Sequence, residues 1–384
     1  MIRKAGASGK MKYKLSDICT YRNGKVDVKD LNAKTYISTE NMLPNKGGIT
    51  EAASLPTVPL TQGYKKDDVL VSNIRPYFKK IWRAKNDGGC SNDVLVFQAN
   101  ENIDKEFLYY VLANDDFFAY SMATSKGTKM PRGDKFSIMQ YEVPNFDLET
   151  QRKIAAVLSA LDDKIELNTA INENLEQQAQ AIFKNLTDDT QSRVPFTSVI
   201  QVLGGGTPKT ENQDYWNGEI PFFTPKDVSY PYALSTEKTV TQAGLDNCNS
   251  RLYPVNTVFL TARGTVGKVS LAGVPMSMNQ SCYALVGKNG LNQIIVYHYV
   301  LDTVKSLKHK ANGAVFDAII TRDFDTEKIP ALSAEQATAF LAIAEPIYNS
   351  ILNRTFENAH LSALHDTLLP KLMNGEIDVS EVKV

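Results

Sequence analysis

Hydrophobic positions between Glu149 and Leu186 recur at alternating steps of four and three residues. No Gly or Pro interrupts this stretch, and eight of the ten seam positions are apolar. The alternation gives the 3.5-residue period of a coiled coil and favours it over a long core helix, which would show a broader apolar face. We therefore predict a helix of about 57 Å that needs a partner helix. The seam comprises Ile154, Leu158, Leu161, Ile165, Asn168, Asn172, Leu175, Ala179, Ile182 and Leu186.

Two asparagines, Asn168 and Asn172, occupy the middle of this seam. A buried amide in a coiled coil costs stability but restricts register and the choice of partner. We therefore expect the pair to fix the register of the predicted helix. Asp147 is the expected cap at the helix start, and Pro144 keeps the residue before it extended.

The region from Lys12 to Asp147 has a short, mixed pattern that is typical of an α/β domain. Runs of β-branched and aromatic residues with Gly, Asn or Asp at their borders predict strands. Apolar residues at steps of three and four predict a helix over 105–123. The predicted strands are 36–40, 67–73, 78–84 and 93–99.

The second half of the chain repeats the first. Six segments of the first half have a counterpart in the second, in the same order, among them KLSDICTYRNG with PFTSVIQVLGGGTP and KEFLYYVLAND with QIIVYHYVLDT. The match places Arg75 opposite Arg263 and Gln151 opposite Gln336, which lies 185 residues further on. The ordered series indicates a tandem duplication of one unit, a mixed α/β domain followed by a long helix.

The duplication supplies the partner helix within the same chain, over about 334–373. Pro346 is expected to kink that helix or delay its start. The fold class is thus α+β (mixed), with two tandem domains joined by two long antiparallel coiled-coil helices around an internal pseudo-two-fold axis. Expected packing positions on the second helix are Ile343, Ile347, Leu361, Leu364 and Leu368. The expected segments are a flexible leader 1–11, a domain 12–148, a helix and linker 149–190, a domain 191–330 and a helix with tail 331–384.

Composition is that of a soluble two- or three-domain protein, with 384 residues and a net charge of −1. The first residues lack the apolar core of a signal peptide, and the longest apolar run is far too short to cross a bilayer. Four cysteines without CxxC spacing read as reduced thiols. We therefore expect a cytoplasmic protein with no membrane contact.

Motifs for catalysis are missing from the sequence. LGGGTPK and ARGTVGKV both depart from a phosphate-binding loop, and no GxSxG or paired histidine ligand set occurs. No Asn/Asp-Pro-Pro-aromatic motif of a base-amino methyltransferase is present. We therefore predict a protein without catalytic activity, metal or cofactor of its own.

Basic residues gather in two segments of the first domain, 75–85 and 126–135. Such segments can neutralise phosphates and bring Arg to guanine edges, although the alternative is an ordinary solvated surface. Trp82 and Phe78 could equally belong to the core. The candidate DNA-binding residues are Arg75, Tyr77, Lys79, Lys80, Arg83, Lys126, Lys129, Arg132 and Lys135, with a thinner set in the second half, Lys209, Arg263, Lys268 and Arg322.

The helix-entry and chain-end motifs resemble a known family. VPNFDLETQRKIAAVLSALDDKIELN and TLLPKLMNGEIDV are similar to the repeated helical regions of the specificity (S, HsdS-type) subunit of type I restriction–modification systems. DDVLVSNIRPYFKKIW and NTVFLTARGTVGKV are similar to segments of that family's target recognition domains. The resemblance covers about residues 12 to 380.

This resemblance implies a non-catalytic subunit in which each domain reads one half of a bipartite site in double-stranded DNA. It implies that the helix pair sets the spacer and docks two methyltransferase subunits, through which restriction/translocase subunits join. The partner subunits would use S-adenosylmethionine, ATP and Mg²⁺. The competing hypothesis is a standalone bivalent DNA-binding or architectural protein.

Overall fold

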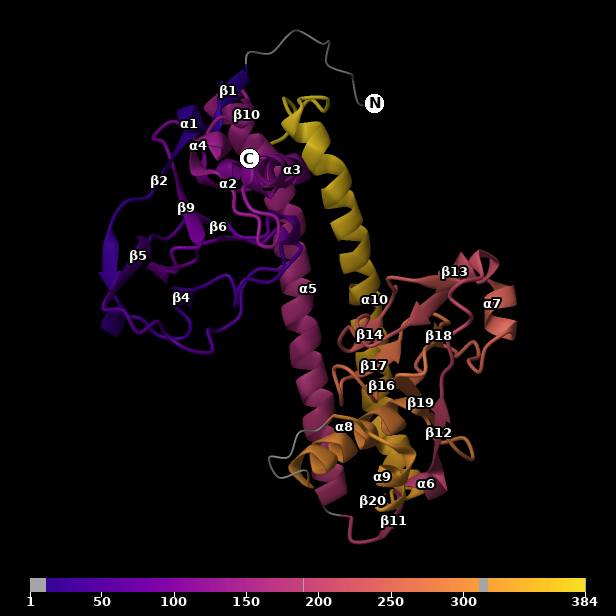
Figure 1. Ribbon diagram of the computed structural model, residues 1–384. Coiled ribbons are helices and arrows are strands. Elements are labelled where there is room, and N and C mark those ends of the chain that lie inside the picture. Colours follow the sequence, from indigo (N-terminus) through magenta and orange to yellow (C-terminus); the bar gives the residue numbers. More distant parts are fainter. Residues whose placement is uncertain (1–11, 189, 311–316, 384) are drawn as a thin grey trace. The chain divides into compact units, whose positions relative to one another are not determined.

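The computed structural model describes residues 12–188, 190–310 and 317–383. The expected leader, 1–11, lies outside the described residues. The chain forms two compact units (Figure 1). The first unit contains residues up to Ile165 and from Leu361 onward, and the second runs from Glu166 to His360. Each unit therefore contains one globular domain and parts of both long helices.

The first unit is built on a four-stranded antiparallel sheet with the order β2-β9-β6-β7. A second sheet, β3-β5-β8-β4, ends in a parallel pair, and β1 pairs with β10. The strands are β1 (Lys12–Lys14), β2 (Cys19–Tyr21), β3 (Lys25–Asp27), β4 (Tyr36–Ile37), β5 (Leu60–Tyr64), β6 (Val69–Ser72), β7 (Ile81–Arg83), β8 (Gly88–Cys90), β9 (Val94–Ala99) and β10 (Glu142–Pro144).

The helix predicted over 105–123 is broken in two at Asn114. This residue is extended, with φ −65° and ψ 137°, and its side chain accepts a hydrogen bond from the Asp116 amide at 3.2 Å. The prediction of one helix was wrong because Asn114 caps a new helix start, an interaction that competes with continued helix. The helices of the first domain are α1 (Leu15–Ile18), α2 (Lys105–Ala113), α3 (Asp115–Ala123) and α4 (Lys135–Ile138), with 3₁₀ turns η1 (Val28–Asp30) and η2 (Pro76–Phe78).

The second unit repeats this strand order with one addition. Its main sheet runs β12-β19-β16-β17-β14, a second sheet runs β15-β13-β18, and β11 pairs with β20. The strands are β11 (Arg193–Pro195), β12 (Ile200–Gly204), β13 (Trp216–Phe223), β14 (Tyr232–Ala233), β15 (Thr239–Val240), β16 (Val258–Thr261), β17 (Val269–Ala272), β18 (Ser277–Met278), β19 (Cys282–Gly287) and β20 (Lys328–Pro330). The helices are α6 (Phe196–Val199), α7 (Gln242–Asp246), α8 (Gln293–Lys310) and α9 (Thr321–Asp325), with 3₁₀ turn η3 (Gln213–Tyr215).

The order β2-β9-β6-β7 matches β12-β19-β16-β17 strand for strand, and β1·β10 matches β11·β20. The parallel pair β4·β8 likewise matches β13·β18. The tandem duplication predicted from the sequence is therefore confirmed. The units differ where helix α8 runs unbroken through 18 residues opposite the divided α2 and α3.

The long helices are α5 (Leu148–Asp188) and α10 (Ala334–Met373). Asp147 caps α5 as predicted, because its carboxylate accepts a hydrogen bond from the Thr150 amide at 2.8 Å. Pro346 does not interrupt α10, which already begins at Ala334, so the expected delayed start is wrong. Both Pro346 and Ala342 are exposed, so water can bond the Ala342 carbonyl that loses its amide donor.

Within the second unit the two helices run antiparallel. Asn168 contacts Glu357 on α10, and Phe183, further along α5, contacts Phe340, which precedes Glu357. Asn168 is 1% exposed, and its amide donates to Glu357 Oε2 and to Asn358 Oδ1, both at 2.8 Å. Figure 1 shows α8 lying across this end of α5, where Tyr297 donates a hydrogen bond to Glu176.

The buried side of α5 follows the expected seam as far as Asn172 and then shifts. Beyond that residue the buried positions are Glu176, Ala179, Phe183 and Thr187, whereas Leu175, Ile182 and Leu186 are only partly buried. The buried face of a straight α-helix drifts away from a 3.5-residue repeat. Helix α8 also covers this end of α5, so the buried face of α5 turns toward the second domain.

Expected packing residues on α10 fall on both sides of the helix. Ile347, Leu361 and Leu368 are partly buried, but Ile343 is 49% exposed and Leu364 is 39% exposed. In place of these two, Ala344, Tyr348, Ile351 and Leu369 are buried. On α5, Ile154 and Leu158 are buried, and Leu161 and Ile165 are partly buried.

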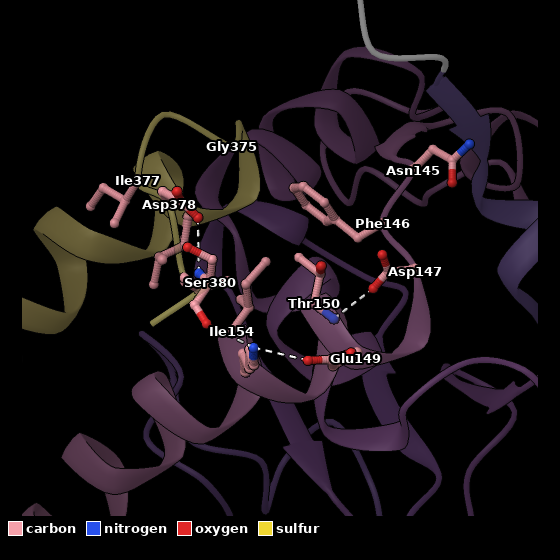
Figure 2. A pocket seen from close by; sticks show the side chains of 13 residues that line it. Asn145, Phe146, Asp147, Glu149, Thr150, Ile154, Gly375, Ile377, Asp378 and Ser380 are labelled. Atoms are coloured by element: carbon pink, nitrogen blue, oxygen red, sulfur yellow. Dashed lines mark hydrogen bonds and ion pairs between the residues drawn. The ribbon is translucent and has the colours of Figure 1, made fainter. Parts of the chain in front are cut away.

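The end of the chain covers the start of α5 in the first unit. Val379 is 6% exposed and belongs to the same apolar core as Ile154 and Leu158. Lys153 donates a hydrogen bond to the Ser380 carbonyl at 2.9 Å. Figure 2 shows the pocket of about 460 Å³ that this tail forms with the first turn of α5.

Candidate nucleic-acid interface

The two basic segments of the first domain meet in space. The Arg75 amide donates to the Pro131 carbonyl at 2.8 Å, which joins the turn after β6 to the loop after α3. That loop is closed by Lys126 and Arg132, whose backbones exchange two hydrogen bonds of 2.9 Å. We call residues 73–80 together with 126–135 the basic loop pair.

Four of the eight candidate cations of this region already hold a protein acid. These ion pairs hold the loops in place and reduce the charge that is free for a ligand. The contacts are Lys79 with Asp115 at 2.7 Å, Arg83 with Glu106 at 2.6 Å, Lys126 with Asp134 at 2.8 Å and Arg132 with Asp93 at 2.7 Å. Lys80 donates to the Thr39 carbonyl at 2.6 Å, and Lys135 lies 5.9 Å from the centre of the Tyr21 ring.

Arg75 and Lys129 are exposed, and their side chains have no ion pair within the described ranges. Burial, and next the charge of Arg75, lowers the pKa of Lys80 from its usual value. Tyr77 is 48% exposed and its ring lies 4.7 Å from that of Phe78, which is 38% exposed. The surface therefore combines free positive charge with aromatic rings, which suits contact with nucleic acid.

Arg83 does not join the basic loop pair. It sits at the far end of β7, where it contacts Glu106 on α2. Trp82 is buried at 9% exposure and belongs to a core cluster, whereas Phe78 is exposed.

In the second unit, the turn between β16 and β17 occupies the place of the Arg75 turn. The Ile319 amide donates to the Ala262 carbonyl at 2.9 Å, as the Gly133 amide does to the Asn73 carbonyl at 3.0 Å in the first unit. Arg263 and Lys268 flank this turn, are exposed, and make no ion pair in the parts of the chain that the structure describes. The strand registers match Lys268 with Lys80 but place Arg263 at the position of Ile74, one residue before Arg75, so the predicted match of Arg75 with Arg263 is wrong by one residue.

Lys209 and Arg322 extend the second set on other elements. Lys209 follows β12 and its carbonyl accepts a hydrogen bond from the Trp216 indole at 3.2 Å. Arg322 is exposed on α9, which directly precedes β20.

A pocket of about 530 Å³ lies beside the Arg263–Lys268 turn. Lys308 donates to the Gly267 carbonyl at 3.0 Å, which ties α8 to the turn. Burial, and next the charge of Lys268, lowers the pKa of Lys308. The pocket of Figure 2 is different in character, because Asp147, Glu149 and Asp378 line it and Lys153 is its one basic lining residue.

The described residues hold no group of three or more His, Cys, Asp or Glu side chains that could bind a metal ion. All four cysteines are free thiols. Burial raises the pKa of both Cys90 and Cys282 to about 12, so these thiols are protonated at neutral pH and are poor nucleophiles. Among the described helices, none combines the length and apolar character that a membrane span requires.

Residues 7–177 and 193–351 both match the model of the type I restriction modification DNA specificity domain. The chain belongs to this family. Its two matches correspond to the two repeats, so the resemblance drawn from the helix-entry and chain-end motifs is confirmed.

Curated relatives carry the same description. The chain is 25% identical to the Type I restriction enzyme HindI specificity subunit of Haemophilus influenzae, over 95% of this chain and 99% of the relative. It is 28% identical to the MjaIX specificity subunit of Methanocaldococcus jannaschii, over 43% of this chain and 39% of that one. The crystal structure of a type I S subunit from M. genitalium has a similar fold, with a TM-score of 0.59, 15% identity and coverage of 97% of this chain and 99% of that one.

Proposed function

We propose that this chain is the non-catalytic recognition subunit of a type I restriction–modification complex and that each domain reads one half of a bipartite DNA site. The observation that carries the proposal is a turn that recurs in both repeats and presents an exposed cation in each. Arg75 in one repeat and Arg263 in the other emerge from the equivalent turn of the main sheet, each exposed and without an acidic partner in the described part of its unit. Different residues flank the two arginines, Ile74 and Pro76 in one and Ala262 and Gly264 in the other, so two equivalent scaffolds can read two different half-sites.

The long helices are proposed to set the unread spacer between the half-sites. Helix α5 alone has 41 residues, which corresponds to about 60 Å at 1.5 Å per residue. The exposed sides of α5 and α10 would dock two methyltransferase subunits, and restriction/translocase subunits would join through these. S-adenosylmethionine, ATP and Mg²⁺ would be bound by those partners and not by this chain.

Sequencing of modified bases tests the recognition function directly. A strain that carries this gene with its methyltransferase should show a methylated motif of two short half-sites around a fixed gap. Deleting one heptad from α5 and the facing heptad from α10 should shorten the gap by about three base pairs, because seven residues span about 10 Å. An unchanged gap in the shortened variant would contradict the spacer role, and the absence of any bipartite motif would contradict recognition.

A standalone bivalent DNA-binding protein is the alternative, since the exposed charges alone do not require an enzyme partner. Co-purification separates the two. Recovery of a stable complex with two methyltransferase copies supports the recognition subunit, whereas tight DNA binding by the lone chain and no such complex supports the alternative.

A further inference from the structure

Phe136 is the most exposed large hydrophobic residue of the described chain, at 76%. It lies in α4, the single helical turn that follows the loop 126–132. Asp134 caps this turn and accepts a hydrogen bond from the Ser137 amide at 2.9 Å. A phenyl ring in this position loses the favourable burial that most rings of the same unit obtain.

The backbone on both sides of Phe136 is held by tyrosine hydroxyls. Tyr21 donates to the Lys135 carbonyl at 3.0 Å, and Tyr120 donates to the Ser137 carbonyl at 3.1 Å. Ile138, two residues on, is 1% exposed and anchors the turn in the core. The turn is therefore fixed, and its exposed ring is presented by an ordered support and not by a loose loop.

Cations surround this support. Lys126 binds Asp134 at 2.8 Å, and this contact, with hydrogen bonds from Ser137, lowers the pKa of Asp134 to about 2. Asp134 thus remains charged and keeps the loop attached to the turn at any physiological pH. The same loop carries the exposed Lys129 and also Met130, which is 48% exposed.

We propose, on the basis of the recognition function above, that Phe136 is a wedge that inserts its ring between two base pairs of the first half-site. Proteins that kink DNA insert an apolar side chain at a base step while neighbouring Lys and Arg hold the phosphates. The exposed Arg75 and Lys129 of the basic loop pair supply the cations, and the anchored turn α4, which directly follows that pair, holds the ring out toward the duplex.

The second repeat carries a different group at this position. Pro144 closes β10 and Pro330 closes β20, and eight residues before each proline stand Phe136 and Arg322. Both lie in a short helix that precedes the matched strand. The wedge therefore belongs to the first half-site, whereas the second domain offers a guanidinium that can bind a phosphate or a base edge.

The test uses the full chain assembled with its methyltransferase and a duplex that carries the motif found by modified-base sequencing. 2-Aminopurine replaces one base at a time in the first half-site, the methylated base excepted. Insertion of the ring unstacks a base step and should raise fluorescence at that step. Phe136→Ala should abolish the rise and weaken binding about tenfold, and Phe136→Trp should retain both.

Val58→Ala is the matched control, because Val58 is 51% exposed in the same unit and lies outside the basic loop pair. Its binding and fluorescence should equal those of the unmodified protein. Arg322→Phe should create a new fluorescent step in the second half-site.

The wedge proposal is contradicted if the unmodified complex binds its motif and 2-aminopurine fluorescence rises at no base step. It is also contradicted if Phe136→Ala shows the same affinity and the same fluorescence as the unmodified protein. Either result leaves DNA recognition intact. Loss of methyltransferase co-purification in Phe136→Ala, with DNA binding unchanged, would also overturn it and assign the ring to a protein contact. Failure of the unmodified complex to bind the motif would overturn the recognition function itself.

Discussion

The two repeats share a sheet but differ in how their cations are held. In the first, Lys79, Lys126 and Arg132 each bind an aspartate, whereas Arg263 and Lys268 in the second have no acidic partner among the described residues. The sequence makes the first repeat look far more basic, yet much of that charge is neutralised within the protein. Free charge, and not the number of basic residues, is therefore the quantity to compare between two such surfaces.

The largest expected effect is a loss of folding stability, and it tests whether the two units unfold independently. Phe183 is 1% exposed and its ring contacts His298 at 4.8 Å and Phe340 at 5.1 Å, so Phe183→Ala should lower the free energy of unfolding by about 3–5 kcal/mol. Leu158→Ala, at a fully buried position of the first unit, should cost about 2–5 kcal/mol.

Hydrogen exchange shows in which unit each substitution lowers stability. Phe183→Ala should speed exchange mainly in the second unit, and Leu158→Ala mainly in the first. Equal acceleration across both units in either variant would show that they unfold as one body.

An acid-dependent loss of stability should arise from His298 in the second unit. Burial lowers the pKa of His298 to about 3, and the ring packs on Phe183 and bonds the Tyr348 hydroxyl at 3.1 Å. The unfolded chain binds a proton below about pH 6.5 and the folded chain does not, so stability falls as the pH falls through that value. Between pH 7 and pH 5 this group should cost about 2 kcal/mol.

His298→Phe should remove that component of the pH dependence, as measured by urea unfolding at both pH values. Tyr299→Phe is the control, because the Tyr299 hydroxyl donates to the Pro330 carbonyl and does not change charge over this range. Equal slopes for the protein and His298→Phe would mean that the ring takes up a proton without unfolding.

The smallest expected effect concerns DNA affinity. Arg75→Ala should weaken binding to a duplex with only the first half-site about tenfold, and Arg263→Ala should do the same for the second. Arg132→Ala should have a smaller effect because Asp93 already holds Arg132 at 2.7 Å. Titration of the assembled complex at physiological salt measures each loss. Equal losses on both half-sites for either variant would contradict the separation of the two surfaces.

The helices were the most predictable part of the fold. A 3.5-residue period and the Asp147 cap are local signals, and both located α5 correctly. The buried face beyond Asn172 was not predictable in the same way, since it depends on α8, which is more than a hundred residues away. The break at Asn114 had a local signal, an Asn followed by two aspartates, that the apolar spacing obscured.

For the candidate interface, the sequence identified the basic segments but not which charges are free. The acids that bind Lys79 and Arg132 lie 36 and 39 residues away along the chain, so only the folded structure pairs them. The sequence did not identify Phe136 as a candidate DNA contact, because an aromatic residue two positions before the apolar Ile138 has the pattern of a core residue. Its exposure follows from the anchors Tyr21 and Tyr120, which are distant in sequence.

The turn that carries Arg75 also has a cost in backbone conformation. Arg75 and Lys79, at the two ends of η2, both have φ of 50°, a left-handed conformation that glycine adopts with less strain. Glycine at either position would therefore be expected to stabilise the uncomplexed chain, while it removes a charged side chain. Selection for thermal stability alone would therefore favour glycine at these two positions and would lower DNA affinity. In a design that aims at a more stable protein, Arg75 and Lys79 should be kept unchanged.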